Sequence, residues 1–83
     1  MILFSYQVFK EDIMKIVIKL EKILADKGFS QHKLANLTGI RQPTINEMCR
    51  NQSLHIPLKN LAKICEVLEC EITDILELVK EQP

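Results

Sequence analysis

Apolar positions recur with helical spacing through most of the chain, and the first clear stripe lies before residue 28. Its members follow one another at intervals of three or four residues, which is typical of one face of a helix. The stripe consists of Ile16, Leu20, Ile23, Leu24 and the solvated Lys27. Gly28 follows at a position where a left-handed residue commonly ends a helix. We therefore predict a helix from about Lys19 to Lys27.

The next segment carries the signals of a helix start. Ser30 supplies a side-chain oxygen that can accept a hydrogen bond from a free backbone N–H of the first turn. Phe29 and Leu34 have the spacing of a hydrophobic staple around that cap. The predicted second helix runs from Gln31 to about Leu37 and stops at Gly39.

A proline limits where the third helix begins. Pro43 is compatible only with a first turn, so the helix runs from about Gln42 to Arg50. Its inner stripe consists of Ile45, Met48 and Cys49. Asn51 then suits a left-handed terminator.

Two more helices follow a loop at residues 52–57. The predicted fourth helix, Leu58 to Leu68, has a stripe formed by Leu61, Ile64, Cys65 and Leu68. A short fifth helix is predicted to start from Thr73 as its N-cap, with Asp74 complementing the dipole in its first turn. The apolar face of this helix consists of Ile72, Ile75, Leu76 and Val79. Five short helices with tight connections predict a compact all-α domain.

Residues 1–15 fit this pattern poorly, and we treat them as a leader, extended or disordered, ahead of a domain at residues 16–83. Apolar residues alternate at Ile2, Phe4, Tyr6 and Val8, which favours a strand only weakly. A disordered leader is an equal alternative, with Met14 as another possible start. Residues 13–18, IMKIVI, are rich in β-branched side chains and are also compatible with an extended segment.

The second and third helices enclose a tight turn centred on Gly39 and Ile40, which is a helix-turn-helix arrangement. The segment SQHKLANLTGIRQPTINEMCRN, from Ser30 to Asn51, resembles the Cro/repressor-type (XRE) helix-turn-helix family. The matching features are the Ser-Gln opening, the Leu34-Ala35 pair, Thr38-Gly39-Ile40 and Thr44-Ile45. The resemblance covers roughly residues 18–79. It implies a repressor-like five-helix fold that places its third helix in the major groove of operator DNA.

The outer face of the third helix holds the candidate base-reading residues. Gln42 and Asn46 each have an amide that can pair bidentately with adenine. Pro43 has no donor and suits contact with a thymine methyl group. Glu47 either accepts from cytosine N4 or only orients a neighbouring arginine. The alternative for Gln42 and Asn46 is ordinary solvated surface.

Other residues are candidates for the DNA backbone. In the resembled family, the residue that matches Gln31 contacts a phosphate and braces the first recognition residue. A helix N-terminus also suits an anion. The further phosphate candidates are Lys33, Arg41, Thr44, Arg50 and Asn51. Arg41 stands where the family usually has a small polar residue, which weakens the N-cap but adds positive charge.

Net charge is zero, but the charges are unevenly distributed. Residues 27–60 carry five basic side chains and one acidic one, a formal charge of +4. Residues 61–83 carry two basic and six acidic side chains, a formal charge of −4. This separation predicts one face for a polyanion and another turned away from it.

No enzymatic, metal or cofactor site is expected. The cysteines are Cys49, Cys65 and Cys70, and their odd number argues against a disulfide framework. No CxxC motif occurs, and the two histidines lack metal-ligand spacing. Neither Ser30 with His32 nor Cys49 with His55 is interpreted as a nucleophile with its base. Ser30 is better explained as a helix cap, and Cys49 lies on the inner stripe of its helix.

Membrane insertion and secretion are not expected either. The longest uncharged apolar stretch, Met1–Phe9, is too short to span a bilayer and lacks the features of a signal peptide. We therefore expect a cytoplasmic protein.

These observations predict a sequence-specific transcriptional regulator that binds double-stranded DNA and acts as a repressor. A homodimer is expected because one helix reads few base pairs, with residues 13–18 or the last helix (Leu78, Val79) as the interface. Alternatively, Ile16 and Ile18 cover the protein's own core. No small-molecule effector is expected, since the chain ends soon after the fifth helix. The alternative function is a protein-interaction module, either antitoxin-like or an anti-repressor partner, that keeps the fold without binding DNA. The zero net charge of the chain favours this alternative, and the +4 charge of residues 27–60 opposes it.

Overall fold

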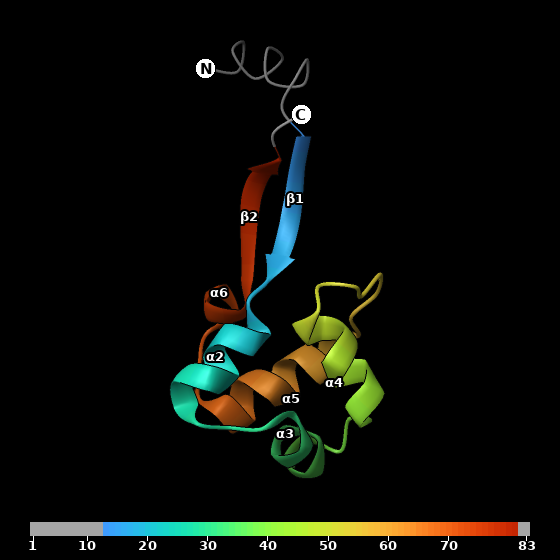
Figure 1. Ribbon diagram of the computed structural model, residues 1–83, viewed down its shortest axis with the longest axis vertical. Coiled ribbons are helices and arrows are strands. Elements are labelled where there is room, and N and C mark those ends of the chain that lie inside the picture. Colours follow the sequence, from blue (N-terminus) through green and yellow to red (C-terminus); the bar gives the residue numbers. More distant parts are fainter. Residues whose placement is uncertain (1–12, 82–83) are drawn as a thin grey trace.

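A bundle of short helices carries a two-stranded β-ribbon that projects from one end (Figure 1). The computed structural model describes residues 13–81, so the alternating segment before residue 13 lies outside the described residues. The elements in chain order are β1 (Ile13–Ile18), α2 (Leu20–Lys27), α3 (Gln31–Thr38), α4 (Gln42–Cys49), α5 (Leu58–Leu68), α6 (Ile72–Ile75) and β2 (Leu76–Glu81). Residues 13–81 contain five helices, as expected, but the β-ribbon shows that the all-α expectation was wrong in part.

The core is built from the inner stripes of the helices. Its fully buried side chains are Leu20, Leu34, Ile45, Met48, Ile64, Leu68 and Ile75. They come from all five helices, so each short helix is held mainly by the apolar face that it shares with its neighbours. The predicted stripes of the third and fourth helices are confirmed, with Cys65 partly buried.

The predicted helix boundaries before residue 40 are confirmed by their capping geometry. Gly28 ends α2 with φ of 71° and Gly39 ends α3 with φ of 79°, both left-handed. Ser30 Oγ accepts a hydrogen bond from the backbone N–H of Lys33 at 3.0 Å. Phe29 packs partly buried against the core, next to this cap.

The last helix is shorter than expected. Glu71, and not Thr73, occupies its N-cap position, and Asp74 Oδ2 accepts from the Glu71 N–H at 2.9 Å. After one turn the chain becomes extended at Leu76. Leu76, Glu77 and Leu78 alternate between apolar and polar, so once a partner strand is present this segment fits a strand as well as a helix.

That partner strand is β1, which pairs antiparallel with β2. Ile16 lies opposite Leu78 and Ile18 lies opposite Leu76, so the assignment of Ile16 to the first helical stripe was wrong. The boundary expected between residues 15 and 16 falls inside β1. Ile18 is buried and Leu76 is partly buried against the core, so these two residues join the ribbon to the helices.

Candidate nucleic-acid interface

The turn between α3 and α4 sets the angle between the two helices. Thr38 Oγ1 donates to the Leu34 carbonyl at 2.7 Å and accepts from the Ile40 N–H at 3.2 Å. Gly39 supplies the left-handed residue that lets the chain leave α3, and the Ile40 side chain is buried in the core. Ala35 packs partly buried against that core, where a larger side chain would separate the helices. The segment therefore forms a helix-turn-helix.

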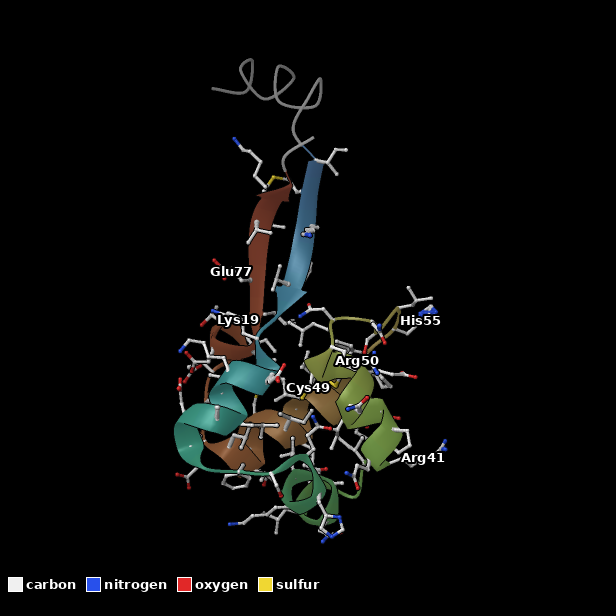
Figure 2. The ribbon with its side chains drawn as sticks, viewed as in Figure 1. Lys19, Arg41, Cys49, Arg50, His55 and Glu77 are labelled. Carbon is white, nitrogen blue, oxygen red and sulfur yellow. The ribbon has the colours of Figure 1, made fainter. Side chains whose placement is uncertain are left out.

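α4 presents the outer face expected for it. Ile45, Met48 and Cys49 are buried, which turns the opposite side of the helix to solvent. Its exposed residues are Gln42, Pro43, Glu47 and the following Arg50, while Asn46 is half-buried. In Figure 2, Arg41 and Arg50 lie at the two ends of α4 and Cys49 lies inside the molecule.

A hydrogen bond connects the outer faces of α3 and α4. Asn46 Nδ2 donates to Gln31 Oε1 at 3.2 Å. The resemblance implied that Gln31 braces the first recognition residue, Gln42, but its partner here is Asn46, one turn further along. The Asn46 amide is therefore oriented before any ligand binds, and its Oδ1 has no partner among the described residues.

Gln42 is held by a residue that sequence reasoning missed. Gln42 Oε1 lies 3.4 Å from His32 Nδ1, and His32 Nε2 lies 3.3 Å from Asn36 Nδ2. His32 thus lies between the amide oxygen of Gln42 and the amide nitrogen of Asn36, and it joins the outer faces of α3 and α4. The spacing of four residues between His32 and Asn36 was the available sequence signal.

The basic candidates surround this polar face. Lys33 Nζ lies 4.6 Å from the centre of the Phe29 ring, which holds the ammonium near the N-terminus of α3. Arg41 is the N-cap of α4 and makes no side-chain capping bond, as expected for an arginine there. Thr44 is half-buried in the first turn of α4.

Asn51 has a different partner from the one expected. Its φ is 56°, which confirms the left-handed conformation after α4. However, its side chain reaches β1: Oδ1 accepts from the Ile18 N–H at 2.7 Å and Nδ2 donates to the Ile18 carbonyl at 2.9 Å. Both amide atoms are therefore engaged with the backbone of Ile18 in this structure.

Glu47 is exposed and forms no ion pair with an arginine in the part of the chain that the structure describes. Its neighbours in α4 therefore leave the carboxylate available to an external donor.

Cys49 lies on the inner face of α4. Cys49 is buried, and burial, followed by the Glu21 carboxylate, raises the pKa of its thiol to about 11. His55 lies out on the loop before α5, as Figure 2 shows. Across residues 13–81, no group of three or more His, Cys, Asp and Glu side chains is placed to hold a metal ion. None of the helices in that range is long and apolar enough to span a membrane.

A model of the Cro/C1-type HTH DNA-binding domain family matches residues 19–81. The chain is 33% identical over 64 residues to YozG of Bacillus subtilis (strain 168), described as an uncharacterized HTH-type transcriptional regulator; the match covers 77% of this chain and 76% of YozG. The fold is similar to that of a Bacteroides fragilis protein proposed to bind DNA, with a TM-score of 0.69, 25% identity, and coverage of 76% of this chain and 100% of that one. It is also similar to the transcriptional regulator VanUg, with a TM-score of 0.67, 30% identity, and coverage of 82% and 89%.

Proposed function

Because the chain belongs to the Cro/C1-type helix-turn-helix DNA-binding family, we propose that it binds a specific operator sequence and represses transcription by occupying it. The observation that carries this proposal is the outer face of α4, where two amides are already oriented by partners on α3. Gln31 orients Asn46, and His32 orients Gln42.

The chemistry of these amides suits base recognition. A Gln or Asn amide offers a donor and an acceptor side by side, which matches N7 and N6 of adenine in the major groove. Each partner on α3 uses one lone pair of the Gln42 oxygen or one hydrogen of the Asn46 amide nitrogen. The other lone pair or hydrogen and the second amide atom stay available, so we expect Gln42 and Asn46 to read adenine. Pro43 then faces a thymine methyl group and Glu47 accepts from a cytosine amino group.

Cations around the same face are proposed to contact phosphates. Arg41 and Arg50 bracket α4, and Lys33 stands at the N-terminus of α3. Gln31 and Thr44, in the first turns of α3 and α4, lie where free backbone N–H groups favour an anion. These positions would fix the register of α4 on the duplex without reading its sequence.

A two-fold arrangement is part of this proposal. One recognition helix contacts only a few base pairs, and repressors of this type place two copies on half-sites about 34 Å apart. The operator is therefore expected to be an inverted repeat.

Fluorescence anisotropy tests the proposal directly. Sites enriched by selection from a random duplex library are titrated at about 50 and 200 mM salt, since phosphate contacts make the affinity fall steeply with salt. Operator binding predicts an enriched inverted repeat, a steep salt dependence, and loss of preference over random DNA in a Gln42→Ala, Asn46→Ala double variant. A chain that enriches no site and binds no duplex at low salt is instead the interaction module.

A further inference from the structure

One face of the β-ribbon carries apolar side chains that remain exposed. Cross-strand partners share a face and alternate residues return to it, so Met14, Ile16 and Leu78 lie together, with Lys80 opposite Met14 at the far end of the same face. Their exposed fractions are 50%, 56% and 61%. We call these three residues the ribbon face. A two-stranded ribbon is at best marginally stable in water by itself, so we expect another apolar surface to pack against this face.

A groove of about 340 Å³ opens where the base of the ribbon face meets the loop before α5. Its ribbon side is formed by Ile16, Ile18 and Leu76, and its loop side by Leu54, Ile56 and Leu58. Leu54 and Leu58 at the rim are 92% and 82% exposed. Ribbon face and groove therefore form one continuous apolar surface, and patches of this kind on a soluble domain mark interaction sites.

We propose that a second copy of the chain covers this surface, with the ribbon face of each copy lying in the groove of the other about a two-fold axis. The same chain presents both a projecting apolar strip and an apolar groove, which is the self-complementary pairing that an isologous dimer requires. The inference adds a specific surface to the two-fold arrangement in the proposed function, but it stands on the ribbon and is tested without DNA.

The exposed apolar surface has the size that a dimer needs. Burying one Leu or Ile side chain removes about 60–120 Å² from water, so five side chains together supply on the order of 300–600 Å². They are Met14, Ile16, Leu78, Leu54 and Leu58. A standard interface takes about 800 Å² from each partner, of which roughly two-thirds is apolar in homodimers. The zero net charge of the chain also means that two copies do not repel each other.

The free edge of β1 is a poorer contact than its face. Asn51 binds the outward-pointing N–H and C=O of Ile18, so only Met14 and Ile16 keep outward-pointing backbone groups on the described strand. Antiparallel pairing of these two residues with a second β1 would place Lys15 directly opposite Lys15 of the other copy, which is unfavourable. Contact through the ribbon face avoids both obstacles.

Sedimentation velocity of the full chain, at about 1 to 100 µM and without DNA, measures the dimer. Ile16→Thr is matched with Ile13→Thr, which lies in the same strand on the opposite face. Leu54→Ser is matched with Leu37→Ser, an exposed leucine on α3. We expect a wild-type dimer, a Kd raised at least about tenfold by Ile16→Thr and by Leu54→Ser, and little change in either control. Circular dichroism confirms that each variant is folded.

A mixing experiment tests whether the ribbon face of one copy contacts the groove of the other. Met14→Glu and Leu54→Lys are each expected to be monomeric, because a charge then faces an apolar surface. Their equimolar mixture should recover a dimer, since it forms one Glu–Lys contact and one wild-type contact. The proposal is overturned by a wild-type monomer at 100 µM, by a dimer that Ile16→Thr and Leu54→Ser leave unchanged, or by a mixture that stays monomeric.

Discussion

The side-chain amide of Asn51 binds both backbone groups of Ile18, with Oδ1 2.7 Å from the Ile18 nitrogen and Nδ2 2.9 Å from the Ile18 oxygen. This pair joins residues 33 positions apart. It connects the end of α4 to the base of the ribbon. The amide occupies the place that a neighbouring strand would take, and so it also ends the free edge of β1.

Replacing Asn51 with glycine should therefore destabilise the fold. Glycine keeps the left-handed backbone at little cost, so the change isolates the loss of two hydrogen bonds. We expect the free energy of unfolding to fall by about 1–3 kcal/mol, measured by urea denaturation. Gln52→Gly, in the exposed loop that follows, controls for added chain flexibility. A loss at Asn51 no larger than that of the control would show that the amide contributes nothing.

The contact between Gln31 and Asn46 predicts coupled effects on specific DNA binding. Asn46→Ala should weaken binding to the selected operator by roughly 1–3 kcal/mol and leave random duplex nearly unchanged. Gln31→Ala should weaken operator binding by a smaller amount, because it removes the group that orients Asn46. In the double variant, the Gln31 change should have a reduced effect, which a double-mutant cycle measures. Strict additivity would show that Gln31 acts independently, through phosphate alone.

Phosphate contacts predict changes in salt dependence. Arg50→Ala and Lys33→Ala should each weaken binding to every duplex and flatten the slope of log affinity against log salt by about one unit. Lys22→Ala is the matched control, since Lys22 pairs with Asp26 on the exposed side of α2. A slope identical to that of the wild type would remove the residue from the phosphate contacts.

The buried thiol of Cys49 predicts a loss of stability at alkaline pH. Its pKa is raised from 9.0 to about 11, first by burial and second by Glu21. Above pH 9 the thiol ionises in the unfolded chain but stays protonated in the folded one. The contribution of the buried thiol to the free energy of unfolding is therefore complete below pH 9 and is lost as pH rises to about 11. The loss is on the order of 2 kcal/mol.

Urea denaturation at pH 8 to 11 of the wild type and of Cys49→Ala separates this contribution from the other titrating groups. Both proteins keep Cys70, whose pKa is also raised to about 11, mainly by burial. The variant should lose less stability across this range than the wild type. Parallel pH profiles would contradict the assignment to Cys49.

Local signals were enough to predict the helix-turn-helix from the sequence. Ser30, Gly39 and Pro43 act through their own backbone geometry, which depends little on the rest of the fold. The inner stripe of α4 then determines which residues face outward, and the structure bears out that orientation. The role of each outward residue at DNA stays a prediction.

The details of the site depended on contacts between helices. The partnership of His32 with Gln42 spans ten residues and depends on the angle between α3 and α4. The amide of Asn51 is able to contact a phosphate, and only the position of β1 shows that this amide binds the backbone of Ile18. Neither relationship leaves a trace in local spacing.

Local signals in the sequence predicted the helical core, the ends of the first two helices and the turn, because apolar periodicity and special backbone conformations are local properties of the chain. Only the tertiary structure decided that residues 76–81 form a strand, since their pattern suits a helix or a strand until Ile13–Ile18 pairs with them. The same non-local pairing moved Ile16 out of a helical stripe and onto the ribbon face. Strand pairing depends on a partner that is distant in sequence, so its energy is absent from any local window.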